Sequence, residues 1–166
     1  LDDVVQVEAG NRVTCARRVA GSVYCWGTGT SGQLGAGANR PFSPTPIPVR
    51  DVRNATALHL TGETACIIDD LAEVYCWGFN GSGQAGPHPS ISSQLFVAQR
   101  VPGVLATQIA GSRHTTCAVG LDDAVRCWGE STVGEAGVLS TDCFFVCDPG
   151  GCSGGCPAGV TTVGGL

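Results

Sequence analysis

Six of the ten cysteines recur in a pattern that could form disulfide bonds. The motif C-x9-C-W occurs three times, and successive copies are 51 residues apart. Cysteines that face each other at a non-hydrogen-bonded site of an antiparallel strand pair have Cα atoms about 4.5–5.5 Å apart, which a disulfide can bridge. The pattern therefore predicts disulfides Cys15–Cys25, Cys66–Cys76 and Cys117–Cys127. The alternative is that all six are free cysteines packed in the core.

The residues between the paired cysteines predict a β-hairpin in each copy. Turn-forming residues lie near the middle, and apolar or β-branched residues lie toward the ends. If the two cysteines lie directly opposite each other, the hairpin loop contains an odd number of residues, and three residues at 19–21 are the simplest choice. The last residue of such a loop commonly has a left-handed conformation, which Gly21 adopts easily. Asp123 also tolerates that conformation. Ala72 fits it poorly, so the second copy is expected to use a different turn.

A tryptophan follows the second cysteine of each copy. Because side chains alternate along a strand, Trp26, Trp77 and Trp128 face away from the disulfides and can pack against the neighbouring repeat as core residues. Each tryptophan begins a second block, W-G-x4-G-[QE]-[LA]-G. Its turn glycines are Gly27, Gly32, Gly35, Gly78, Gly83, Gly86, Gly129, Gly134 and Gly137.

Further strands flank each hairpin, which leads to an all-β fold of β-propeller blades. A first strand precedes the hairpin, and a proline-tolerant edge strand follows the glycine block near residues 42–49 and 92–101. Four-stranded units at this period are typical of propellers. We expect one repeat region of three four-stranded repeats of 51 residues, an incomplete ring. Its parts are blades at about 4–50, 51–103 and 104–140, an insertion at 141–158 and the start of a further strand at 159–166.

The C-terminal insertion is rich in cysteine. Its spacing C-x3-C-x4-C-x3-C favours two disulfides of undetermined connectivity, and a zinc site is the alternative. Phe144 and Phe145 would form a contact patch if exposed, or a small core if they fold inward. The four cysteines are Cys143, Cys147, Cys152 and Cys156.

The segments AGNRVTCARRVAGSVYCWGTGTSGQLG, TGETACIIDDLAEVYCWGFNGSGQAG and AGSRHTTCAVGLDDAVRCWGESTVGEAG together resemble the regulator-of-chromosome-condensation repeat, in its cysteine-bearing, secreted bacterial form. The resemblance covers about residues 4–137 and implies a seven-bladed propeller. Family members include a guanine-nucleotide exchange factor, a plant light receptor and a secreted β-lactamase inhibitor, so the fold does not choose the function. The chain departs from the family in having three copies, which leaves two blade faces to be covered by a longer parent protein or by assembly.

Charge and composition narrow the class of partner and the compartment. The net charge is −5 and the nine basic residues are scattered arginines, which argues against nucleic acid as a partner. No apolar run approaches the ~18 residues of a membrane helix, so membrane insertion is not expected. Ten cysteines favour an extracellular, cell-surface or periplasmic location. The absence of methionine indicates that a signal peptide or longer precursor has been removed.

No set of residues predicts catalysis or a cofactor. The chain lacks the lysine of a phosphate-binding loop and a G-x-S-x-G motif, and His59, His88 and His114 take unrelated repeat positions. Paired aspartates at 69–70 and 122–123 leave calcium as an alternative. We expect a non-enzymatic interaction or assembly module, part of a filament, ring or longer surface protein. The alternatives are a secreted inhibitor or ligand-binding propeller, and then a GTPase exchange factor. Contacts to a protein partner or a second copy are expected from Arg17, Arg18, Glu73, Arg126 and the insertion.

Overall fold

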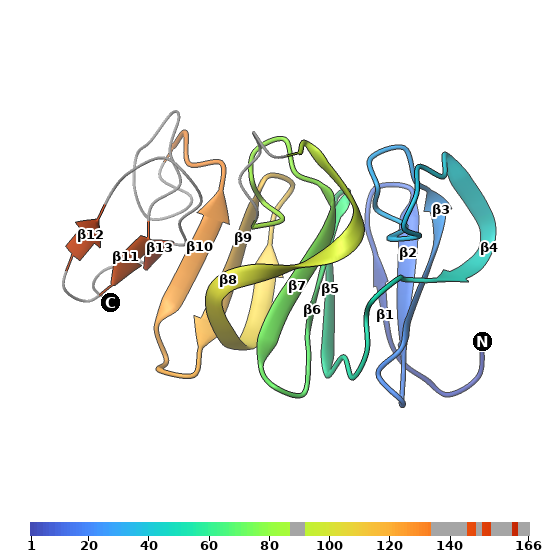
Figure 1. The fold of residues 1–166 in the computed structure, drawn as a ribbon, viewed down its shortest axis with the longest axis horizontal. Helices are drawn as coiled ribbons and strands as arrows, with labels where there is room; N and C mark the ends of the chain where they lie inside the picture. The colour runs from blue at the N-terminus through green and yellow to red at the C-terminus, as the bar shows by residue number, and fades with distance from the viewer. Residues whose placement is uncertain (87–91, 134–145, 149–150, 154–160, 163–166) are drawn as a thin grey trace.

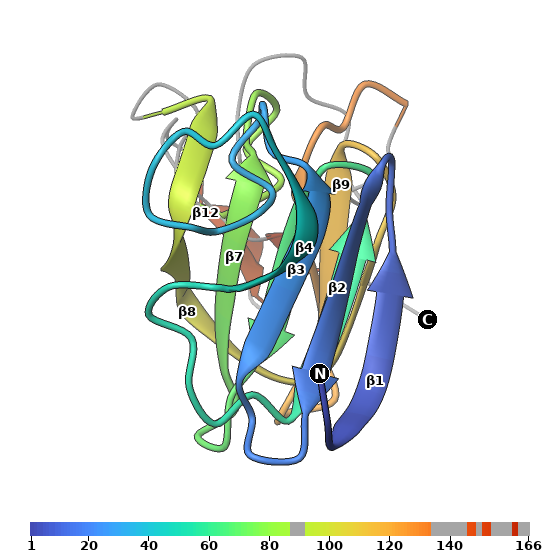
Figure 2. The ribbon, with the colours of Figure 1, turned by 90° about the vertical axis from the view of Figure 1, so that its right-hand side faces the viewer.

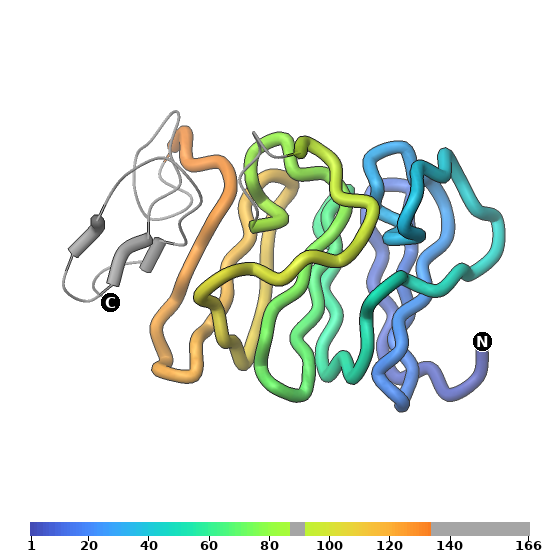
Figure 3. Tube along the Cα trace, viewed as in Figure 1, coloured from blue at the N-terminus to red at the C-terminus, as the bar shows by residue number. Residues whose placement is uncertain are grey.

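The structure is a computed structural model of the 166-residue chain. It describes residues 1–86 and 92–133, together with the backbone of three short strands at 146–148, 151–153 and 161–162. Three antiparallel groups of strands stand side by side in chain order (Figures 1 and 3). Viewed onto the first group, the others lie stacked behind it (Figure 2). The part of the chain that the structure describes has no helix long and apolar enough to span a bilayer.

Each group follows the order of the chain, with every strand paired to the next. The first sheet contains β1 (Val4–Ala9), β2 (Val13–Arg18), β3 (Val23–Thr28) and β4 (Phe42–Pro48). The second group contains β5 (Ala57–Thr61), β6 (Thr64–Ile68), β7 (Glu73–Phe79) and the beginning of β8 (Gln94–Gly111). The third contains the end of β8, then β9 (Thr115–Gly120), β10 (Val125–Gly129) and β13 (Thr161–Thr162).

The strand β8 passes from the second group to the third without a break. Its residues up to Leu105 pair with β7, and those from Ala106 onward pair with β9. Sequence reasoning expected separate strands on the two sides of the Pro102-Gly103 pair. The strand stays continuous because Gly103 takes a φ of 74° and the pairing with β7 shifts register, so the chain bends without leaving the ladder.

The three cysteine hairpins share one geometry. Cys15 lies opposite Cys25, and the equivalent residues of the other two copies are paired in the same register. Disulfide bonds join all three pairs, whose Cα atoms are 4.1, 4.1 and 4.0 Å apart. The predicted disulfides Cys15–Cys25, Cys66–Cys76 and Cys117–Cys127 are therefore confirmed.

The three hairpin loops also share one turn, and the expectation for Ala72 is wrong. The third loop residue has a positive φ in every copy: 77° at Gly21, 62° at Ala72 and 60° at Asp123. A left-handed alanine costs about 1–2 kcal/mol. The side chain of Asp69 offsets this cost, because its Oδ1 accepts hydrogen bonds from two backbone N–H groups of the turn, at 2.9 and 2.8 Å. This aspartate therefore orders its own turn.

Two tryptophans connect successive groups of strands. Trp77 is fully buried, and its Nε1 donates a hydrogen bond to the backbone oxygen of Gln33 at 3.0 Å. Trp128 makes the same bond to the backbone oxygen of Gln84 at 2.8 Å. Both acceptors belong to the glycine block of the preceding repeat. Trp26, which has no preceding repeat among the described residues, is partly exposed.

The C-terminal region is described only through short strands. β11 (Val146–Asp148) and β12 (Gly151–Ser153) form an antiparallel pair with Cys147 in register with Cys152. The predictions about the side chains of this region concern side chains that lie outside the described part of the structure. They concern Cys143, Phe144, Phe145, Cys147, Cys152 and Cys156, and the turn glycines Gly134 and Gly137.

The strand β13 takes the place of a fourth strand in the third group. Thr161 lies opposite Cys127 on β10, just as Ile47 on β4 lies opposite Cys25 on β3. Sequence reasoning expected the start of a further strand at residues 159–166, and β13 lies in that range. The long insertion lies between β10 and this strand.

The glycine after each tryptophan is required by a close backbone approach. Gly27, Gly78 and Gly129 have φ values of 104°, 102° and 111°. A Cβ atom on Gly78 would lie 2.2 Å from the backbone oxygen of Glu63, and the other two glycines face equivalent turns at 2.3 and 2.2 Å. The next N–H, that of Phe79, donates to the same Glu63 oxygen at 2.9 Å. These glycines therefore let the backbone pack closely against the turn that joins the first and second strands of each repeat.

Replacing Gly78 by alanine is expected to destabilise the fold strongly. The matched control is Gly103→Ala, because Gly103 also has a positive φ but a Cβ there would meet no atom within 4 Å. Gly103→Ala should cost about 1–2 kcal/mol from the left-handed conformation alone. Gly78→Ala should cost at least about 2 kcal/mol more, because the backbone must also move. Urea unfolding of both variants measures this difference, and equal losses would contradict the role given to Gly78.

Candidate functional site

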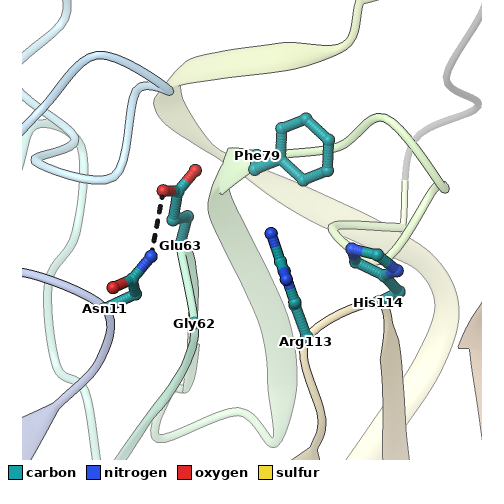
Figure 4. A pocket seen from close by; sticks show the side chains of 6 residues that line it. All are labelled: Asn11, Gly62, Glu63, Phe79, Arg113 and His114. Carbon is teal, nitrogen blue, oxygen red and sulfur yellow. Dashed lines mark hydrogen bonds between the residues drawn. The ribbon is translucent and has the colours of Figure 1, made fainter.

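Three turns meet at the upper edge in Figure 1 and line a cavity of about 490 Å³, here called the turn pocket. The turns are those between β1 and β2, between β5 and β6, and between β8 and β9. An aromatic side chain from the end of β7 completes the lining (Figure 4). The lining residues are Asn11, Gly62, Glu63, Phe79, Arg113 and His114.

The repeat places these residues together. Asn11, Gly62 and Arg113 are spaced by 51 residues and occupy the same turn position in successive repeats. The backbone N–H of Asn11 donates to the oxygen of Gly62 at 2.7 Å, which links the first two turns. Gly62 lies beside Arg113: a Cβ atom built on the glycine would be 3.6 Å from Arg113 Cγ, an ordinary contact distance.

The carboxylate of Glu63 is oriented by the first repeat. Its Oε2 accepts a hydrogen bond from the hydroxyl of Ser31 at 2.8 Å, and its Oε1 accepts a longer one from Asn11 Nδ2 at 3.5 Å. Figure 4 shows the Asn11 contact at one side of the pocket. Because both donors come from the neighbouring repeat, Glu63 is held in one orientation by the packing of the repeats.

The opposite side of the pocket contains a histidine paired with a carboxylate. His114 Nδ1 lies 2.5 Å from Glu130 Oε2. The ring of Phe79 lies beside the imidazole, with 6.4 Å between the ring centroids and an angle of 46° between the planes. The pair joins the β8–β9 turn to the residue that follows β10, so it fixes this wall of the pocket.

Arg113 has a fixed backbone and a guanidinium that faces the cavity. Its backbone oxygen accepts a hydrogen bond from Gln84 Nε2 at 3.4 Å. Figure 4 shows its side chain extending between Glu63 and His114. Within residues 1–86 and 92–133, no hydrogen bond or ion pair is made by this guanidinium. A guanidinium in this setting can bind a carboxylate through two parallel hydrogen bonds.

Two of the arginines expected to contact a partner bind their own chain. Arg17 Nε donates to Gln6 Oε1 and its Nη1 donates to the backbone oxygen of Ala55, both at 3.2 Å. Arg18 Nε donates to the backbone oxygen of Asp2 at 2.8 Å. Arg17 thereby connects the first repeat to the segment before β5, which is a structural role.

Glu73 also has partners within the chain. The Tyr75 hydroxyl donates to Glu73 Oε2 at 2.9 Å, and Arg100 forms an ion pair with its Oε1 at 2.7 Å. The hydrogen bond to Glu73, followed by burial, raises the pKa of Tyr75. This cluster lies on β7 and β8, away from the turn pocket.

Arg126 forms a two-pronged ion pair with Asp122, with N–O distances of 2.7 and 2.5 Å. The hydrogen bonds from Arg126 lower the pKa of the Asp122 carboxyl. Because the folded pKa is lowered, the pair stabilises the fold above the ordinary aspartate pKa of about 3.9 and loses this effect as the pH falls below it.

Removing the Asp122 carboxylate is expected to have a small effect that depends on pH. Asp122→Asn should lower the unfolding midpoint slightly at pH 7, because an exposed ion pair contributes little. The difference from the wild type should shrink as the pH is lowered below about 4. Urea unfolding at pH 7, 5 and 3 measures it. A difference that grows with acidification would contradict the ion pair.

In residues 1–86 and 92–133, no group of three or more His, Cys, Asp or Glu side chains is placed to hold a metal ion. Sequence reasoning missed Asn11, Glu63, Phe79 and Arg113, and it noted of His114 only that its repeat position differs from those of His59 and His88. The 51-residue spacing of positions 11, 62 and 113 was the available signal. It was hidden because the three residue types differ.

Part of the chain matches a known repeat. Residues 4–33 and 20–59 match the Regulator of chromosome condensation (RCC1) repeat. The mouse secretion-regulating guanine nucleotide exchange factor is 31% identical over 153 residues, covering 82% of this chain and 32% of that protein. The human E3 ubiquitin-protein ligase HERC2 is 30% identical over 125 residues, covering 73% of this chain and 3% of that protein. The chain thus spans about a third or less of the length of these two relatives.

Solved structures show the same fold. Yeast RCC1 (Prp20), in a crystal structure with Kap60, superposes with a TM-score of 0.75 at 19% identity, covering 98% of this chain and 38% of that chain. Human WBSCR16 gives a TM-score of 0.73 at 21% identity, covering 85% of this chain and 37% of that chain. The predicted all-β, propeller-like fold is confirmed for a segment that covers part of such a ring.

Proposed function

We propose that this chain of RCC1 repeats is a non-enzymatic protein-interaction module, and that its turn pocket binds an acidic side chain of a partner protein. We further propose that the chain is a segment of an extracellular or cell-surface propeller. A secreted inhibitor or a ligand-binding propeller is the alternative to this role.

One observation supports the proposal above the others. The residues that form the frame are identical in all three repeats: the paired cysteines, the tryptophan and the glycine after it. The residues at the turn positions that meet at the pocket differ, being Asn11, Gly62 and Arg113. Binding surfaces are usually built from variable residues on loops that a rigid scaffold holds in place.

One cationic side chain of the pocket supports an acidic group as its ligand. Glu63 is bound by Ser31 and Asn11, and His114 is paired with Glu130. The guanidinium of Arg113 is the cationic group of the lining that has no acidic partner among the described residues. An aspartate or glutamate of the partner would pair with it, and Phe79 would contact the carbon atoms of that side chain.

Three disulfides within 166 residues support an oxidising compartment.

A second candidate function is guanine nucleotide exchange, which is supported by the likeness to the mouse exchange factor. Reducing conditions would break the three bonds, which weighs against a cytosolic exchange factor. Measuring nucleotide release from small GTPases, with the chain kept oxidised, tests this candidate directly.

The proposed function is tested by photo-crosslinking from the pocket. A photoreactive amino acid at position 11, which lies in the lining and leaves Arg113 in place, should yield a crosslinked partner in extracellular fluid from the source, and excess wild-type protein should compete it away. The same group at the exposed position 53 is the matched control. Arg113→Glu protein should fail to compete. Equal labelling from both positions, or equal competition by Arg113→Glu, would refute the role of the pocket.

A further inference from the structure

The turn pocket contains a carboxylate whose charge is not neutralised by the chain. Glu63 accepts hydrogen bonds from the hydroxyl of Ser31 and the amide of Asn11, at 2.8 and 3.5 Å. Both donors are uncharged, so they orient the carboxylate and leave its negative charge in place. In residues 1–86 and 92–133, no arginine or histidine nitrogen lies within 4.0 Å of the Glu63 oxygens. The half-buried Glu63 therefore presents a negative charge to the cavity.

The same cavity contains a positive charge that does not pair with Glu63. Arg113 is exposed, and Figure 4 shows its side chain extending between Glu63 and His114. The two turns that carry the charges are neighbours, because a Cβ atom on Gly62 would lie 3.7 Å from Arg113 Cα. No nitrogen of the Arg113 guanidinium lies within 4.0 Å of an acidic oxygen in the described part of the chain. The pocket thus offers one negative and one positive group at separate positions.

The wall beside these charges is held in place. The Phe79 ring packs against Gly81, where a Cβ atom would lie 2.4 Å from the ring carbon Cζ. His114 is bound to Glu130, so it does not compete for Glu63. The aromatic ring keeps water from one side of the cavity, which strengthens the attraction between the charges of the pocket and those of a ligand.

We infer that the turn pocket binds a segment of the partner that carries an acidic and a basic side chain close together. The acidic group pairs with Arg113, and the basic group pairs with Glu63. A ligand with an acidic group alone would cover the Glu63 carboxylate and leave it without a cation, which costs free energy. The inference rests on the proposed function, because it takes the acidic group on Arg113 from there and adds the second group. In an extended segment, side chains two positions apart point to the same side and can reach both charges.

The inference is tested by NMR titration of the oxidised ¹⁵N-labelled chain with short peptides whose ends are blocked. Two dipolar peptides, containing Asp-Ser-Arg and Arg-Ser-Asp, cover both chain directions. Their acidic analogues have glutamine in place of arginine, and their basic analogues have asparagine in place of aspartate. The better dipolar peptide should bind about three- to tenfold more tightly than either of its analogues, because each analogue loses one charge-assisted hydrogen bond. Shifts of the backbone N–H signals of Asn11, Glu63 and His114 should place the peptide in the pocket.

Three variants separate the two charges. Glu63→Gln keeps an oxygen that can accept from Ser31 and Asn11, and it should bind the dipolar peptide no more tightly than the acidic one. Glu8→Gln is the matched control, because Glu8 is also half-buried, accepts a hydrogen bond from a neutral amide at 3.2 Å and lies outside the lining. It should keep the wild-type preference. Arg113→Gln should lose binding of the dipolar and acidic peptides alike.

The outcomes distinguish the inference from the proposed function. Equal binding of the dipolar and acidic peptides by the wild type would overturn the inference alone, as would equal loss of the preference in Glu63→Gln and Glu8→Gln. Arg113→Gln that binds as tightly as the wild type would overturn both, and so would the absence of binding by every peptide at millimolar concentration. Circular dichroism checks the fold of each variant, and the comparison of peptides on the wild type decides the inference even if a variant does not fold.

Discussion

Replacing Trp77 with alanine is expected to reduce the free energy of unfolding by about 3–5 kcal/mol, the cost of truncating a fully buried aromatic side chain. The indole is 0% exposed and packs against the preceding repeat, where Gly35 leaves room for it. Its removal also leaves the buried backbone oxygen of Gln33 without its donor. Urea unfolding, followed by circular dichroism, measures the loss.

The chain contains its own control for this prediction. Trp26 has the same place in the first repeat but is partly exposed. Trp26→Ala should therefore cost clearly less than Trp77→Ala at concentrations where the protein is monomeric. If the two substitutions destabilised the monomer equally, the indole of Trp77 would not be a contact between repeats.

Reducing the three disulfides is expected to unfold the chain. Each bond joins cysteines 10 residues apart, and closing so short a loop stabilises a fold by about 2–3 kcal/mol. The bonds lie on separate hairpins, so their contributions should add to about 6–9 kcal/mol. This sum is comparable to the whole stability of a typical domain, about 5–15 kcal/mol.

A single hairpin provides the comparison. The double variant Cys66→Ala and Cys76→Ala, kept oxidised, should lose only about 2–3 kcal/mol and stay folded. Circular dichroism and unfolding midpoints with and without reductant measure both effects. A fully reduced chain with the midpoint of the oxidised chain would show that the disulfides do not stabilise the fold.

The hairpins were predictable because their information is local. A pair of cysteines with nine residues between them, next to a tryptophan, determines the strand register, the disulfide and the side on which the indole lies. The turn at Ala72 was not predicted, although its cause is also local. The carboxylate of Asp69 orders the loop through hydrogen bonds from two backbone N–H groups. The prediction considered only the left-handed conformation required at Ala72 and not this side chain.

The features that depend on contacts between repeats could not be predicted in the same way. The Pro102-Gly103 pair is typical of a turn, but β8 continues through it because both halves of the strand find partners, in β7 and in β9. The turn pocket has no motif of its own. Its residues differ from repeat to repeat and come together only because successive repeats pack side by side.

The central claim is that the indoles of Trp77 and Trp128 are bound to the glycine block of the preceding repeat, and NMR of the oxidised ¹⁵N-labelled chain tests it most directly. The structure predicts a nuclear Overhauser contact between the Trp77 indole N–H and the α protons of Gly35. It also predicts slow hydrogen exchange for the indoles of Trp77 and Trp128, and fast exchange for that of Trp26. Fast exchange at all three indoles, with no contact between Trp77 and Gly35, would contradict the claim.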